Sequence, residues 1–158
     1  MINAINEAEK NLISGIDIPV GCVIKKDGKI IVSTHNLREK NNDVTAHAEL
    51  LAIKETQRVL KTSRLIDCEM YVTLEPCPMC GWAIIQSGIK TLYFGSYNSQ
   101  YGAMGSVLDL PKLANSKIRV FGGIEEEKCD KILEDFWCKI RGNGNINPHP
   151  NLEILEGD

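Results

Sequence analysis

Two short segments, His47-Ala48-Glu49 and Pro76-Cys77-Pro78-Met79-Cys80, place the strongest constraint on how this 158-residue chain folds. Each lies where a helical pattern begins, and Pro78 suits the first position of a helix. One histidine and two cysteines supply three ligands to a tetrahedral Zn²⁺ ion and leave its fourth position open to water, as in catalytic sites. We therefore expect two helix N-termini to converge on one zinc ion bound by His47, Cys77 and Cys80.

Glu49 is the expected catalytic residue. Two helical residues that are two apart point to nearly opposite sides, so His47 and Glu49 can share a site only at the end of a helix. A free carboxylate there would accept the proton of the water and return it to the substrate and leaving group. The helix dipoles would favour both thiolates and hydroxide. Such a site is suited to hydrolysis.

Other interpretations of the Cys-x-x-Cys pair stay open, because a redox pair or half of a structural zinc site has the same spacing. A structural site needs a fourth protein ligand. The other histidines, His35 and His149, lie at a predicted strand end and near the C-terminus, and no second Cys-x-x-Cys occurs. The other four cysteines fall on predicted strands or the last helix, where free cysteine is a small buried apolar side chain: Cys22, Cys68, Cys129 and Cys138.

The order of predicted elements indicates an α/β fold. Helical patterns cover residues 2–14, 47–60, 78–87 and 125–142, and strand patterns cover 19–26, 29–34, 68–74, 91–95 and 118–121. The turn Asp27-Gly28 joins the first two strands as an antiparallel hairpin. Later strands alternate with helices, which is typical of parallel crossovers. We expect a mixed five-stranded sheet covered by helices.

Composition indicates one domain and narrows the partners. At 43% apolar residues the chain suits a single core, and we expect a domain at 1–142 followed by a loosely ordered tail at 143–158. No signal peptide or membrane span is evident, which favours a reducing cytoplasm and no membrane partner. The net charge of -3 argues against strong non-specific nucleic-acid binding, although recognition of a few exposed bases stays possible.

The chemistry-bearing segments also carry a family resemblance, which extends to about residue 142. The matching stretches are Pro19-Val20-Gly21, Asn36, Thr45-Ala46-His47-Ala48-Glu49, Tyr71-Val72-Thr73-Leu74-Glu75-Pro76-Cys77 and Gly102-Ala103-Met104-Gly105-Ser106. In these stretches the chain resembles the bacterial tRNA-specific adenosine deaminases of the zinc-dependent cytidine and deoxycytidylate deaminase superfamily.

This resemblance implies a cytidine deaminase-like, three-layer α/β/α sandwich that deaminates adenosine to inosine at the tRNA wobble position. It implies zinc binding by His47, Cys77 and Cys80, with Glu49 as the proton shuttle. The implied partners are a tRNA anticodon loop and a second copy in a homodimer, with no organic cofactor. The implied substrate-binding residues are Asn36, Ala48, Val20, Leu74 and Asn98.

One segment departs from the family pattern. Residues 96–101 (Ser-Tyr-Asn-Ser-Gln-Tyr) carry no charge, whereas the family usually has an aspartate with basic neighbours there. Asn98 replaces this aspartate and so removes a carboxylate that would repel a phosphate group or accept a hydrogen bond from a 2′-hydroxyl group. Tyr97 and Tyr101 offer aromatic rings on which bases could stack. We therefore hypothesise that Asn98 relaxes discrimination between RNA and DNA.

Two rival functions remain. Guanine deaminase and other small-molecule purine deaminases share Pro-Cys-Pro-Met-Cys and the zinc site, and the modest net charge suits them. A non-catalytic partner subunit or zinc-stabilised binding module is the second rival. It would not need Glu49.

Overall fold

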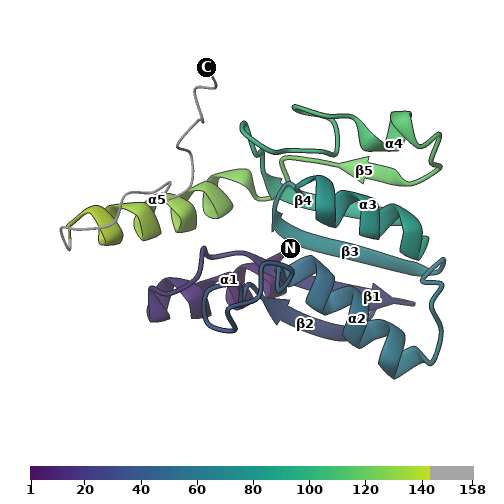
Figure 1. Cartoon of the computed structure of the whole chain (residues 1–158), viewed down its shortest axis with the longest axis horizontal. Coiled ribbons are helices and arrows are strands. Elements are labelled where there is room, and N and C mark those ends of the chain that lie inside the picture. Colours follow the sequence, from purple (N-terminus) through teal and green to yellow (C-terminus); the bar gives the residue numbers. More distant parts are fainter. Residues whose placement is uncertain (143–158) are drawn as a thin grey trace, which may run out of the picture.

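A mixed five-stranded sheet forms the centre of the molecule in the computed structural model, which describes residues 1–142 (Figure 1). The strand order is β2-β1-β3-β4-β5. β1 (Gly21–Lys26) pairs antiparallel with β2 (Lys29–His35) and with β3 (Cys68–Leu74). β4 (Thr91–Ser96) and β5 (Arg119–Phe121) then add in parallel. The predicted sheet is confirmed, and the tail predicted at 143–158 lies outside the described residues.

The β1–β2 hairpin turns at the predicted dipeptide. Asp27 and Gly28 both have positive φ angles, 50° and 74°, and Lys26 pairs with Lys29 across them. Two consecutive positive φ angles match the twist of the flanking strands, which is why an Asp-Gly pair favours this turn. β1 begins at Gly21, two residues later than expected.

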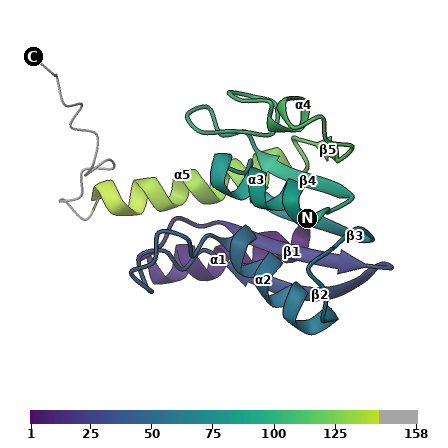
Figure 2. The same ribbon diagram turned by 45° about the vertical axis from the view of Figure 1, so that its right-hand side comes forward.

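Helices cover both faces of the sheet and give three layers (Figures 1 and 2). α2 (Ala48–Leu60) and α3 (Pro78–Ser87) lie on one face, and α1 (Ile2–Ser14) and α5 (Glu126–Gly142) lie on the other. This arrangement confirms the α/β/α sandwich. A single turn, α4 (Leu110–Leu113), packs on α3 and was not expected from the sequence. Among residues 1–142, no helix has the length and apolar character needed to cross a membrane.

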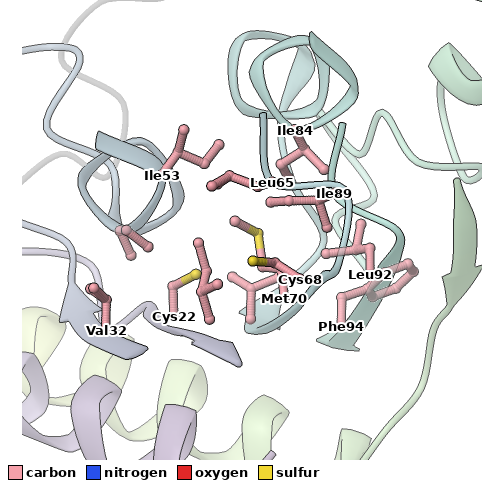
Figure 3. Close-up of a cluster of buried hydrophobic side chains, with 14 of the residues drawn as sticks. Cys22, Val32, Ile53, Leu65, Cys68, Met70, Ile84, Ile89, Leu92 and Phe94 are labelled. Atoms are coloured by element: carbon pink, nitrogen blue, oxygen red, sulfur yellow. The ribbon is translucent and has the colours of Figure 1, made fainter. Parts of the chain in front are cut away.

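The main core lies between the sheet and the α2–α3 layer (Figure 3). Met70, Ile84 and Leu92 are fully buried there, together with Cys22 and Cys68. These residues come from the central strands β1, β3 and β4 and from α3, whose start carries one of the two candidate ligand segments. Burial of this apolar surface therefore holds the starts of α2 and α3 against the sheet.

A smaller core joins α1 and α5 on the opposite face. Cys129 and Ile132 pack there, and Phe136 continues the buried stripe along α5. The expectation that Cys138 is buried was wrong, because Cys138 is exposed. It follows Phe136 by two positions, which turns it to nearly the opposite side of the helix.

α1 approaches β1 at a glycine. A Cβ atom at Gly21 would collide with the carbonyl oxygen of Ala4 and the backbone of Ala8. Only a residue without a side chain allows this spacing between helix and strand. The close contact places α1 directly behind the segment that leads into β1.

Candidate metal centre and substrate pocket

Two helix starts carry the candidate metal ligands, as the sequence predicted. His47 is the N-cap of α2, with φ -71° and ψ 147°, and Cys77 is the N-cap of α3, with φ -72° and ψ 171°. Cys80 lies in the first turn of α3, after Pro78 at the helix start. The positive ends of both helix dipoles therefore point toward the same three side chains.

The spacing of the three ligand atoms fits a tetrahedral metal ion. The Nδ1 atom of His47 lies 3.8 Å from the Sγ atom of Cys77 and 3.5 Å from that of Cys80. All three ligand atoms lie within 4.8 Å of one another. Typical zinc bonds to sulfur and nitrogen place tetrahedral S and N ligands about 3.5 Å apart. His47, Cys77 and Cys80 thus form a site that can hold a metal ion.

The ligands interact strongly with one another. Hydrogen bonding from the Cys80 thiol lowers the pKa of Cys77 to about 4, although burial opposes this shift. The same contact, together with burial, raises the pKa of Cys80. Hydrogen bonding to Cys77 raises the pKa of His47. A metal ion binds only to deprotonated thiols and a neutral imidazole, so metal affinity at this site depends on pH.

Glu49 lies in the first turn of α2, beside the ligands. The residue is 4% exposed, and this burial raises the pKa of its carboxyl group. His47, Glu49 and Cys77 all line one cavity. The structure therefore brings the candidate catalytic carboxyl and the candidate ligands to one surface.

That cavity has a volume of about 440 Å³. Pockets of about 300–1,000 Å³ are usual for small-molecule sites, so a nucleoside-sized ligand fits. All five residues predicted for substrate binding line it: Val20, Asn36, Ala48, Leu74 and Asn98. Apolar and polar side chains thus meet in this cavity.

Asn36 and its surroundings are held by α1. The Asn36 Nδ2 atom donates to Ile18 O at 3.3 Å, and its Oδ1 atom accepts from Arg38 N at 3.4 Å. Behind this wall, the buried Asn11 donates from Nδ2 to Ile18 O at 3.2 Å and to Asn36 O at 2.9 Å. One amide hydrogen and one lone pair of the side-chain oxygen of Asn36 therefore stay available to a ligand. Asn11 was not singled out from the sequence.

Asn98 is also partly committed to its own loop. Its Oδ1 atom accepts from Gln100 N at 3.2 Å and from Tyr101 N at 3.0 Å. Tyr101 is exposed and lines the cavity. Tyr97 instead packs edge-on against Phe94, with ring centroids 5.1 Å apart. Of the two tyrosines proposed for base stacking, Tyr101 is the one at the pocket.

Two buried carboxylates and one arginine were missed by the sequence analysis. Asp17 accepts from Glu39 N at 2.6 Å and Lys40 N at 3.4 Å, and so holds the loop that carries Arg38 to the cavity. Glu75, to which no individual role was assigned from the sequence, accepts hydrogen bonds from the segment 98–106. The partners are distant in sequence, so no local pattern indicates these contacts.

Known relatives agree with this architecture. The chain is 41% identical over 143 residues to the tRNA-specific adenosine deaminase of Aquifex aeolicus (strain VF5), covering 89% of this chain and 93% of that protein. A solved structure from a study of A-to-I editing by tRNA:A34 deaminases at the wobble position superposes with a TM-score of 0.80 at 34% identity, covering 84% of this chain and 97% of that one. Guanine deaminase from Bacillus subtilis superposes with a TM-score of 0.60 at 29% identity, covering 92% and 94%.

A family model covers the part of the chain that contains all the candidate ligands. The model of the cytidine and deoxycytidylate deaminase zinc-binding region matches residues 1–96, which is more than half of the 158 residues. This range also includes the helix starts that carry Glu49 and Cys77. On this match and on the likeness of sequence and fold, the chain belongs to the cytidine and deoxycytidylate deaminase zinc-binding family.

Proposed function

We propose that this protein is a zinc-dependent tRNA adenosine deaminase that converts adenosine to inosine at the wobble position of the anticodon. The observation that carries the proposal is the convergence of a His-Cys-Cys ligand set and a buried carboxyl group on one cavity of nucleoside size. The relatives named above support tRNA as the substrate.

In this proposal three side chains bind the metal ion and a fourth, Glu49, transfers protons. His47, Cys77 and Cys80 hold a zinc ion, which when bound supplies a Lewis acid that lowers the pKa of water. The Glu49 carboxylate takes one proton from the attacking water and passes it to N1 of adenine, then takes the second proton from the new C6 hydroxyl group and passes it to the amino group, so that ammonia leaves C6. The reaction adds water, releases ammonia and forms inosine.

Other pocket residues bind and orient the base. Asn36 offers an amide hydrogen and an oxygen to the purine edge, while Val20 and Leu74 provide apolar contacts. The Ala48 N–H group lies in the first turn of α2, where helical N–H groups have no partner within the helix. It donates to the oxygen that arrives at C6.

The substrate in this proposal is an exposed anticodon loop. Bases in such a loop are unstacked at little cost, so a net charge of -3 does not prevent their recognition. Arg38, an exposed cation that lines the cavity, is suited to contact a phosphate group next to the target base. The enzyme acts in the cytoplasm, where a reducing environment keeps Cys77 and Cys80 free to bind zinc.

A homodimer is part of the proposal. Met79 and Trp82 expose apolar surface on α3, and Val107 and Leu108 do so on the loop before α4. Because α4 packs on α3, the two exposed apolar stretches lie on neighbouring elements, and we infer that a second copy covers them. Light scattering tests this: Trp82→Glu should yield a monomer, whereas Ile13→Glu, on the exposed side of α1, should not.

One experiment separates the proposed substrate from its rival. The zinc-loaded protein is incubated with an anticodon stem-loop that carries a wobble adenosine, with the same stem-loop carrying guanosine there, and with free guanine or adenosine. Release of ammonia and formation of inosine only with the first substrate is expected. Turnover of free guanine without turnover of the stem-loop would establish the guanine deaminase function, which the likeness to the Bacillus subtilis enzyme favours as the second candidate.

A further inference from the structure

We infer that Glu75 is a positioning residue whose buried carboxylate fixes one wall of the substrate pocket. It holds the segment 98–106 against the turn between β3 and α3, and this segment brings Asn98 and Tyr101 to the cavity. The identity of the substrate in this inference rests on the proposed function. The arrangement itself does not.

The carboxylate of Glu75 is surrounded by donors from one segment. Its Oε1 atom accepts from Met104 N at 3.1 Å and from Ser106 N at 3.2 Å. Its Oε2 atom accepts from Asn98 N at 3.2 Å and from Ser106 Oγ at 2.5 Å. The residue is only 1% exposed. The four hydrogen bonds thus hold both ends of the segment, at Asn98 and at Ser106. Hydrogen bonds to a charged group are stronger than those between neutral groups, so this contact should contribute strongly to the position of the segment.

The segment folds around this carboxylate. Asn98 O accepts from Gly102 N at 2.8 Å, and Pro76 O accepts from Ala103 N at 2.9 Å. A Cβ atom at Gly102 would collide with Glu75 Oε2, Ser106 Oγ and Asn98 O. The absence of a side chain at Gly102 therefore allows the backbone to approach the carboxylate closely.

The position of this anchor links the two sides of the pocket. Glu75 itself lines the cavity, and it lies in the chain between Leu74, which also lines it, and the Pro76-Cys77 pair, which leads into α3 and carries a candidate ligand. Buried apolar side chains anchor the segment at Ala103 and Met104, beyond the residues that line the cavity. The carboxylate thus sets the distance between Tyr101 and the metal centre.

Glu75→Gln is the principal test, because it keeps size and shape but replaces one acceptor oxygen with an NH₂ group that faces donors. Hydrogen exchange of the amides in 98–106 should accelerate, while exchange in the strands stays unchanged. Loss of a hydrogen bond to a charged group predicts a KM for the stem-loop raised by about tenfold or more. The kcat value and the zinc content should stay close to those of the unchanged protein, since Glu49 and the ligands remain in place.

Two further variants make the test specific. Gly102→Ala should reproduce the faster local exchange and the higher KM, because it disturbs the same contact from the other side. Asp135→Asn is the matched control: this exposed carboxylate accepts from Lys131 Nζ at 3.2 Å on α5, and Asp135 does not line the cavity. It should change neither KM nor the exchange of 98–106.

The possible results decide the inference without depending on activity. Unchanged exchange in 98–106 for Glu75→Gln would overturn it, and so would loss of zinc with unchanged local exchange, which would show that Glu75 acts on the metal ligands. Faster exchange across the whole protein would assign Glu75 to general stability and also overturn it. If the unchanged protein fails to deaminate the stem-loop, the proposed function fails, while local exchange still tests the positioning role.

Discussion

The metal centre and the segment 98–106 border the same pocket but are built in different ways. His47, Cys77 and Cys80 are fixed by the starts of two helices that pack on the main core. The segment 98–106 lies partly on the surface and is held by hydrogen bonds to one buried carboxylate. Apolar burial thus positions the residues that carry the chemistry, and polar contacts position part of the binding surface. Changes in the first region should abolish activity, and changes in the second should alter affinity.

Cys80→Ala should have the largest effect. Removing this buried ligand from α3 should lose the metal, reduce deamination to background and lower the melting temperature by about 5–10 °C, because metal binding contributes to folding. Metal analysis, ammonia release and thermal unfolding measure these effects. Cys138→Ala, at an exposed position of α5, is the control and should match the unchanged protein. Full zinc content in Cys80→Ala would contradict the ligand assignment.

Glu49→Ala should abolish turnover and keep the metal. Loss of general acid–base catalysis predicts a fall in kcat of roughly a hundredfold to ten-thousandfold, while zinc content stays unchanged because Glu49 is not among the candidate ligands. Single-turnover deamination and metal analysis measure the two quantities. Glu55→Ala, at a partly exposed position of the same helix that does not line the cavity, is the control. Substantial activity in Glu49→Ala would exclude the shuttle role.

Asp17→Asn tests whether the opposite wall of the pocket behaves like the segment 98–106. Asp17 is buried and accepts from two N–H groups of the loop that carries Arg38. Weakening these bonds should raise KM by about threefold to tenfold and leave kcat and zinc content nearly unchanged. Steady-state kinetics give the split, with the exposed Asp67→Asn as control. A fall in kcat with constant KM would mean that this wall acts through the metal centre.

Asn98→Asp should have the smallest effect on the fold and tests nucleic-acid discrimination. An aspartate oxygen can accept from Gln100 N and Tyr101 N just as the Asn98 oxygen does, so the loop should keep its shape. The added charge should lower turnover of a DNA hairpin relative to the matched RNA hairpin by a few-fold, about one tenfold step at most. Gln100→Glu places the same charge outside the cavity lining. Undetectable DNA turnover by the unchanged protein would reject the hypothesis.

The sequence predicted the parts of the molecule that depend on local patterns. The helix start at Pro78 follows from the preference of proline for the first helical position, and the hairpin follows from Asp27-Gly28. For this reason the sheet and the proximity of the ligands were predicted correctly from the residue patterns, whereas the three-layer sandwich was predicted from the family resemblance.

Contacts between distant residues explain what the sequence did not reveal. Glu75 contacts residues 23, 29 and 31 positions away, and Asp17 contacts residues 22 and 23 positions away. Such hydrogen bonds leave no periodic signal. In addition, a helix of one turn such as α4 is too short to show an apolar repeat.

The hydrogen bonds of Asn11 have a consequence for how this enzyme can be altered. Asn11 belongs to α1, yet it fixes the carbonyl groups of Ile18 and Asn36 from behind. A shift of α1 would therefore move the wall of the pocket that contains Ile18 and Asn36, while the identity of every residue that lines the pocket stays the same. Substrate range can thus be tuned from the rear of the molecule, by protein engineering or by natural variation, with the reaction centre intact.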